Sequence, residues 1–146
     1  MALARSEIVA RLLVVSENRI LLASRRGQTW YYLPGGRARP DETLEDAARR
    51  ELDAQAGLDI GALDFVGCLE DTRTEHGTAV HQLTTVFAAP LPWAAQIISN
   101  DPGQHLSSVA IEDLDELELR PAVLTGMIRR WLVGRRPTWR TVTPTT

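Results

Sequence analysis

A helix-like segment stands between apolar runs that have the length of strands, and this order of elements limits the folds open to the chain. Residues 41–43 supply acids and a capping side chain, which predict a helix from about residue 42 to Ala56. Gly57 follows as a residue that readily takes the left-handed conformation at a helix C-terminus. One face of this helix is apolar, yet it also carries the carboxylate of Glu51, and a charge placed there is costly without a partner.

The segments on both sides of this helix predict strands. Residues 7–15 and 19–24 are apolar runs joined by a turn at residues 17–18, which is typical of a β-hairpin. After the helix, residues 62–71 and 79–91 predict two longer strands joined by a polar loop. Strands therefore surround the helix in the sequence.

The last third of the chain adds a short strand and a second helix. Residues 107–111 predict the strand, a turn of helix is expected at 112–117, and a last helix at 122–133. The arginine- and threonine-rich residues 134–146 predict a flexible tail. Strands around one central helix, with another helix late in the chain, indicate an α/β (α+β) fold of the sandwich type.

Length and composition set further bounds. A chain of 146 residues suffices for one domain with its own core, and Cys68 has no second cysteine with which to form a disulfide. The net charge of −3 and pI near 5.6 give no overall basic field for nucleic acid, although all 16 basic residues are arginine. No stretch approaches the roughly 18 apolar residues of a membrane span, so we expect a cytoplasmic protein without a membrane anchor.

Several side chains before the helix predict a ligand site. Gly35 and Gly36 place backbone amides where the chain can turn tightly and approach a ligand closely. Arg25 and Arg26 could bind a phosphate bidentately, and Tyr32 could stack on a base. The alternatives are that the arginines are solvated at the surface and that the aromatic ring packs at the edge of a strand.

Residues 36–58, GRARPDETLEDAARRELDAQAGL, resemble the signature box of Nudix hydrolases, G-x5-E-x7-R-E-U-x-E-E-x-G-U with U aliphatic. The fixed positions that match are Gly36, Glu42, Arg50, Glu51, Leu52, Gly57 and Leu58. The resemblance extends over residues 6 to about 133 and implies a single domain, an α/β/α sandwich with a mixed sheet and a central loop-helix-loop. It also implies cleavage of a nucleotide or other organic pyrophosphate with Mg2+ or Mn2+, by a protein that is often a homodimer.

The chain departs from this box at the two acids that follow the conserved Arg-Glu. The Glu-Glu pair of the family is Ala54-Gln55 here, and alanine offers no ligand while Gln55 offers only a neutral carbonyl oxygen. Asp53 lies about 160° from Glu51 around the helix and points to solvent. Glu51 and Gln55 therefore remain as the candidate metal ligands on the helix.

The same resemblance suggests roles for other residues. Glu70 and Glu75, at the end of one expected strand and in the loop after it, are the candidate external acids that would serve as a catalytic base or metal ligand. Glu42 and Arg50 are expected to form an ion pair that shapes the box, with Gly57 ending the helix.

Two functions remain open at this point. The first is a divalent-metal-dependent hydrolase of a nucleoside diphosphate derivative or related organic pyrophosphate, in which Glu51, Gln55 and an external acid hold the metal. The second is a non-hydrolytic protein that binds a nucleotide or phosphate ligand in a cleft of the same shape. In the second case an arginine inside the fold, such as Arg25 or Arg26, would pair with Glu51.

Overall fold

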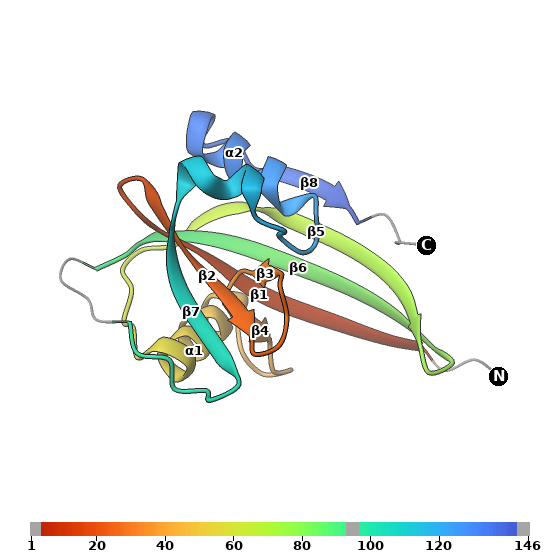
Figure 1. Cartoon of the computed structure of the whole chain (residues 1–146). Helices are drawn as coiled ribbons and strands as arrows, with labels where there is room; N and C mark the ends of the chain where they lie inside the picture. The colour runs from red at the N-terminus through yellow and green to blue at the C-terminus, as the bar shows by residue number, and fades with distance from the viewer. Residues whose placement is uncertain (1–3, 93–96, 143–146) are drawn as a thin grey trace.

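The computed structural model describes residues 4–92 and 97–142, which form a mixed sheet with helices on both faces (Figure 1). The strands are β1 (Ala4–Ser16), β2 (Arg19–Arg25), β3 (Tyr31–Tyr32), β4 (Gly35–Arg37), β5 (Asp64–Glu75), β6 (Thr78–Pro90), β7 (Gln104–Ala110) and β8 (Thr138–Thr141). The helices are α1 (Leu44–Ala56), the 3-10 helix η1 (Ile111–Glu116) and α2 (Leu124–Gly134).

The sheet joins the two halves of the chain through its central strands. The described strands lie in the order β3-β2-β1-β6-β5-β8, with β4 also paired to β1 and β7 to β2. β1 runs parallel to β6 along its length, from Ala4 opposite Ala79 to Val15 opposite Pro90. The β1–β2 and β5–β6 pairs are antiparallel, so the sheet is mixed, as the sequence predicts.

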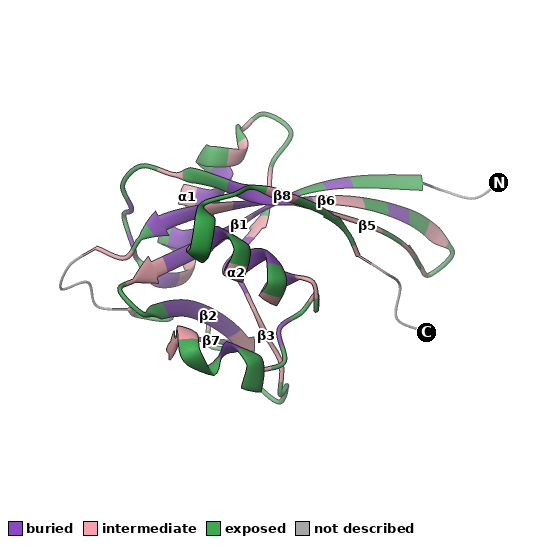
Figure 2. Cartoon of the chain, turned by 90° about the horizontal axis from the view of Figure 1, so that it is seen from above, coloured by how far each residue is buried: buried purple, intermediate pink, exposed green. Residues whose placement is uncertain are grey.

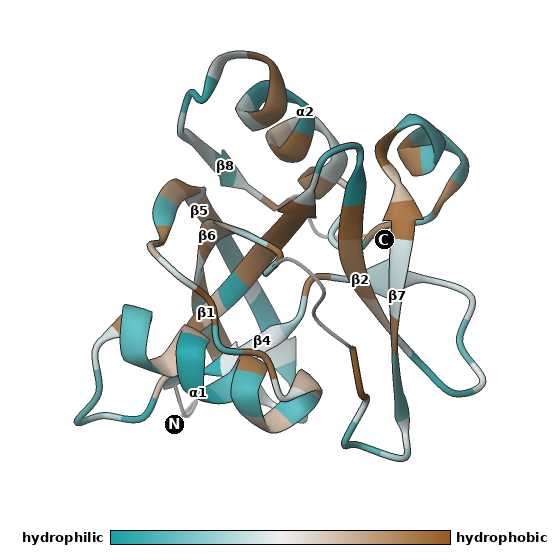
Figure 3. Cartoon of the chain, turned by 90° about the vertical axis from the view of Figure 1, so that its left-hand side faces the viewer, coloured by the Kyte–Doolittle hydropathy of each residue, from teal (hydrophilic) through white to brown (hydrophobic). Residues whose placement is uncertain are grey.

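Helices cover both faces of this sheet. Side chains alternate along β1, so that Leu12 packs in the cluster under α1 while Leu13 packs in the cluster under η1 and α2. Figure 1 places α1 and α2 on opposite sides of the sheet, and Figure 3 shows hydrophobic residues along β1 and β2. The arrangement is an α/β/α sandwich, which confirms the fold class.

Local capping explains why α1 begins and ends where it does. The Thr43 hydroxyl accepts a hydrogen bond from the Asp46 amide at 3.1 Å, which satisfies one of the free N–H groups of the first turn. Gly57 has a φ of 64° and its amide donates to the Asp53 carbonyl, so the helix ends in a left-handed residue as predicted. The buried face consists of Ala47, Ala48, Leu52 and Ala56.

Two expectations about the second half of the chain need correction. The polar loop expected after residue 71 is strand, because β5 continues to Glu75 and turns at His76 and Gly77, both of which have positive φ. The flexible tail is also wrong for Thr138–Thr141, which form β8 and pair in parallel with β5. Residues 143–146 lie outside the described part of the chain.

The helices are short. α1 has 13 residues and α2 has 11. Within residues 4–92 and 97–142, no helix has both the length and the apolar character needed to span a membrane.

Candidate functional site

A cavity of about 770 Å³ opens beside α1, between the Gly35–Gly36 segment, the inner strands and the residues that precede β7. Its charged lining residues are Arg11, Arg25, Arg37, Arg120, Glu51 and Asp101. Four arginines against two acids give this lining a net charge of +2. A positively charged cavity of this size fits an anionic small molecule.

Glu51 lies at the helix side of the cavity, with both carboxylate oxygens already bonded. Arg50 Nη1 donates to Glu51 Oε1 at 2.8 Å, and Gln55 Nε2 donates to Glu51 Oε2 at 3.0 Å. Arg50, rather than Arg25 or Arg26, is thus the arginine in contact with this acid. Gly36 passes so close that an added Cβ would stand 2.7 Å from the Glu51 Cδ, so a larger residue there would require the Glu51 side chain to move.

Gln55 bridges Glu51 to the glycine-rich strand β4. Its Nε2 also donates to the Gly35 carbonyl at 2.9 Å, and its Oε1 accepts from the Gly35 amide at 3.3 Å. These two bonds to one residue fix the orientation of the amide, because the flipped side chain would place N–H against N–H and oxygen against oxygen. Gln55 therefore turns its nitrogen, not its carbonyl oxygen, toward Glu51.

Arg11 enters the same group of contacts from β1. Its Nη1 donates to the Gly35 carbonyl at 3.1 Å and to the Leu33 carbonyl at 3.3 Å, and its guanidinium lies 5.8 Å from the Tyr32 ring centroid. Burial lowers the pKa of the Arg11 guanidinium, while the nearby Tyr32 and Glu51 raise it. An arginine retains its proton under such opposing effects, so the cavity contains a fixed internal cation.

The ion pair expected within the box is bidentate. Arg50 Nη2 lies 2.6 Å from Glu42 Oε1 and its Nε lies 3.0 Å from Glu42 Oε2, while the Arg39 amide also donates to Oε1 at 2.8 Å. The Arg50 hydrogen bonds, helped by Arg39, lower the pKa of Glu42 from 4.5 to about 2. The same contacts raise the pKa of Arg50.

These bonds give Glu42 a defined pH dependence. Because its pKa is about 2 in the fold and 4.5 in the absence of these partners, the stability it contributes is present above pH 4.5 and is lost as pH falls toward 2. We expect the NMR titration of the Glu42 carboxyl to move up toward its ordinary range in Arg50→Gln. Arg39→Gln is the matched control, and its shift should be much smaller because the backbone amide remains. Equal shifts in both variants would contradict this assignment.

The two external acid candidates do not line the cavity. Leu69 lines it, and Glu70 is the next residue of the same strand, so its side chain projects from the opposite face and contacts His81 Nε2 at 2.6 Å. Glu75 lies six residues beyond Leu69, which on a strand is about 20 Å. Asp101, which precedes β7, is the second acid of the cavity lining, in addition to Glu51.

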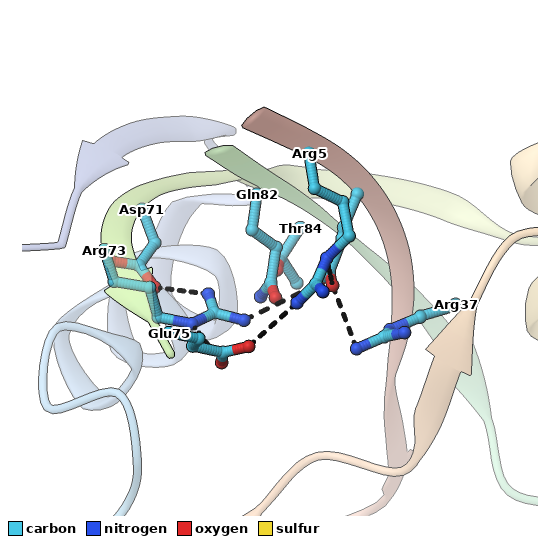
Figure 4. A network of polar contacts seen from close by, with 8 residues as sticks. Arg5, Arg37, Asp71, Arg73, Glu75, Gln82 and Thr84 are labelled. Atoms are coloured by element: carbon cyan, nitrogen blue, oxygen red, sulfur yellow. Dashed lines mark hydrogen bonds and ion pairs between the residues drawn. The ribbon is translucent and has the colours of Figure 1, made fainter. Parts of the chain in front are cut away.

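Glu75 belongs instead to a cluster at the far end of the sheet, where the ends of β1, β5 and β6 extend past the helices (Figure 1) and are largely exposed or half-buried (Figure 2). This cluster, the Glu7 network, consists of Arg5, Glu7, Arg37, Asp71, Arg73 and Glu75. Figure 4 shows its arginines converging beside Gln82 and Thr84.

Glu7 is the buried centre of the Glu7 network. Only 4% of its side chain is exposed, and its two oxygens meet Arg5 Nε and Arg37 Nη2 at 2.9 Å each and Arg73 Nη2 at 3.5 Å. Arg37 also lines the cavity, so the Glu7 network adjoins the site through this residue.

Of the other residues that the sequence suggested for ligand binding, two line the cavity and one does not. Arg25 and Tyr32 line the cavity, and the buried Gln104 donates to the Tyr32 hydroxyl at 3.0 Å. Arg26, although adjacent to Arg25, does not belong to the lining. Arg120 and Trp30 also line the cavity, and the Arg120 guanidinium lies over the Trp30 ring at 4.7 Å from its centroid.

Four charged residues of the cavity lining were not expected from the sequence, namely Arg11, Arg37, Arg120 and Asp101, and neither was Asn100. Arg11 is the lone charge within the apolar segment of residues 8–15, which is a signal that could have singled it out. Asp101 had no such signal, because its segment has no regular pattern. Asn100 joins that segment to α1 by two hydrogen bonds. Its side-chain Nδ2 donates to the Ala54 carbonyl at 3.2 Å, and its backbone N–H donates to the Gln55 carbonyl at 3.0 Å.

The donor set at this site does not fit a divalent cation. Mg2+ and Mn2+ are held by several oxygen ligands, usually with more than one carboxylate. Here N–H groups already donate to both Glu51 oxygens and to the Gly35 carbonyl. Within the described residues, no group of three or more His, Cys, Asp and Glu side chains is arranged to hold a metal ion.

Comparison with known proteins agrees with the fold and with the box. Residues 6–130 match the family model of the NUDIX domain. A MutT protein from Bacillus halodurans superimposes with a TM-score of 0.79 at 18% identity, covering 94% of this chain and 91% of that one. An ADP-ribose pyrophosphatase from Streptococcus suis gives a TM-score of 0.64 at 19% identity, covering 92% and 98%. With the family model matched over most of its length, this chain belongs to the Nudix family.

Proposed function

We propose that this chain binds a nucleoside diphosphate derivative or related organic pyrophosphate in the cavity, and that it does so without a hydrolytic metal centre. The observation that carries the proposal is the lining charge of four arginines against two acids, a net +2 in the absence of any metal ion. A pyrophosphate group is a dense anion, and arginine suits it because its planar guanidinium can donate two parallel hydrogen bonds.

The cavity also suits the organic part of such a ligand. Trp30 and Tyr32 line it with ring centroids 5.6 Å apart, and the Arg120 guanidinium covers one face of Trp30. Aromatic faces and guanidinium planes both stack on nucleobases. Members of the family bind small nucleotide substrates, and one structural neighbour is an ADP-ribose pyrophosphatase, which supports this class of ligand.

Weak hydrolysis that depends on a divalent metal is the second candidate. Nudix hydrolases generally use divalent metals, and Glu51 still faces the cavity with 21% of its side chain exposed. The donors on its oxygens argue against this candidate, since Arg50 and Gln55 take up part of the capacity of the carboxylate and the Arg50 charge would lie beside a metal bound there.

Isothermal titration calorimetry with ADP and ADP-ribose in EDTA tests the binding proposal. We expect both compounds to bind, and Arg25→Gln to weaken binding by about 10-fold or more, the value of one or two lost charge-assisted hydrogen bonds. Arg26→Gln is the matched control, because this neighbour lies outside the cavity lining and its loss should leave affinity unchanged. Failure of both compounds to bind, or equal effects of the two variants, would refute the proposal.

A turnover assay decides between the two candidates. The purified protein is incubated with ADP-ribose and Mg2+ or Mn2+, and AMP release is followed by chromatography. We expect no release above that of a protein-free control. Release by the wild type that disappears in Glu51→Gln would replace the binding proposal with the hydrolase.

A further inference from the structure

We propose that the Arg11 guanidinium, together with the Gln55 amide, takes the place of a metal ion at the Gly35 carbonyl, so that Arg11 is both the anchor for the ligand's phosphate and the group that excludes a divalent cation. The inference rests on the proposed function for the class of ligand. Its claim about the cation rests instead on the contacts of Arg11 and Gln55 with the Gly35 carbonyl.

Two donors from distant parts of the chain converge on one oxygen. Arg11 Nη1 from β1 reaches the Gly35 carbonyl at 3.1 Å, and Gln55 Nε2 from α1 reaches the same oxygen at 2.9 Å. The Gln55 nitrogen continues to Glu51 Oε2 at 3.0 Å. Both the backbone oxygen and the carboxylate would suit a hard cation, but the Gly35 carbonyl already accepts two N–H groups and each Glu51 oxygen already accepts one.

Charge is balanced within this group of contacts. Glu51 contributes one negative charge, which Arg50 contacts directly and which also favours the charged form of Arg11. Arg50 is balanced in turn by its bidentate pair with Glu42. Arg11 therefore supplies the positive charge that offsets Glu51 at the cavity wall, and it keeps Nε and Nη2 donors beyond the two bonds made by Nη1.

Restoring the two missing acids would therefore not restore a metal site while Arg11 remains. A carboxylate at position 55 would replace an amide that shares the Gly35 oxygen with Arg11, so it would lie within reach of the guanidinium and pair with it. The positive charge of Arg11 would also repel a cation that coordinates the Gly35 oxygen.

Binding of Mn2+ alone, measured by electron paramagnetic resonance of the free ion and by calorimetry, tests the exclusion of metal. The double variant Ala54→Glu/Gln55→Glu should bind Mn2+ weakly, and adding Arg11→Met should tighten binding by about 10-fold or more, because methionine keeps the apolar stem without the charge. Adding Arg25→Met instead is the matched control, since it removes an equal charge from the cavity without touching Gly35. Arg11→Lys in the double variant retains the charge and should keep Mn2+ binding weak.

Binding of ADP in EDTA tests the anchor. In the otherwise unchanged protein, Arg11→Met should weaken ADP binding by about 10-fold or more. Near-ultraviolet circular dichroism and urea unfolding confirm that each variant is folded before its binding is interpreted.

The outcomes separate this inference from the proposed function. If the double variant binds Mn2+ as tightly as the Arg11→Met triple variant, or if Arg25→Met has the same effect as Arg11→Met, the exclusion of metal by Arg11 is refuted. If ADP binds the wild type and Arg11→Met equally, the anchor is refuted while the proposed function stands. If ADP does not bind the wild type at all, the proposed function fails, and the Mn2+ series still decides whether Arg11 excludes the cation.

Discussion

The Gly35→Ala variant is expected to lose about 3 kcal/mol or more of its free energy of unfolding, because neither the space nor the backbone at this position accepts a side chain. Gly35 has a φ of 138°, and an added Cβ would lie 2.1 Å from the Ala10 carbonyl oxygen and 2.8 Å from the Arg11 Cα. Both atoms belong to the backbone of β1, so they cannot move aside as a flexible side chain would. The measurement is the midpoint and slope of urea unfolding.

The same substitution at Gly61 is the matched control. Nothing lies within 4 Å of a Cβ built there, so we expect a change within about 0.5 kcal/mol. Gly36→Ala should fall between the two, since its obstacle is the Glu51 side chain, and the added substitution Glu51→Ala should relieve most of its cost. A Gly35→Ala protein as stable as Gly61→Ala would show that β4 does not lie against β1 as described.

The second large effect is expected for Glu7→Gln, which should lower the free energy of unfolding by about 2 kcal/mol. Glu7 is the buried acid that contacts Arg5, Arg37 and Arg73. A neutral side chain at this position would leave three guanidinium groups close together without the negative charge between them. The arginine side chains keep 44%, 66% and 30% of their surface exposed, so the cost comes from the repulsion among these cations once the buried acid is neutral. Urea unfolding at pH 7 and at low ionic strength is the measurement.

Asp115→Asn is the control for this experiment. Asp115 pairs with Arg129 at 2.9 Å, but 73% of the Asp115 side chain is exposed, so its loss should cost less than about 1 kcal/mol. The Glu7→Gln effect should also resist added salt, because water and ions reach the buried carboxylate poorly. If both variants were equally mild, Glu7 would be an ordinary surface acid.

The fold was largely accessible from the sequence because its signals are local. The hairpin of β1 and β2, the capped ends of α1 and the late helix α2 each follow from periodicity and turn residues within a short window. The extension of β5 to Glu75 could not be predicted from the sequence. Thr72–Glu75 are polar, and they are strand because they pair with β6 in the sheet. β8 was also not predicted, because its formation depends on pairing with a distant part of the chain. Gly67 leaves room for the backbone of Thr138, about 70 residues later in the sequence.

Sequence spacing predicted the lining residues that lie together on α1. It did not predict the lining residues that only the folded chain brings near this helix. Spacing on α1 placed Glu51 and Gln55 side by side, and the structure brings them into contact at 3.0 Å. Spacing could not reveal that Arg11 meets Gln55 at the Gly35 carbonyl, because β1, β4 and α1 converge only after the sheet has formed. Strand alternation places Leu69 and Glu70 on opposite faces of β5, but the sequence does not reveal which of these faces lines the cavity.

The short strand β8 has a consequence for handling the protein in solution. It covers the outer edge of β5 between Gly67 and Glu70, where the unpaired backbone groups of an edge strand would otherwise invite a neighbouring chain. Beyond that point the edge is guarded by Asp71, Arg73 and Glu75, whose charges oppose intermolecular pairing. Shortening the chain before residue 138 would therefore uncover the apolar part of this edge and favour aggregation, even though no residue of the cavity is removed.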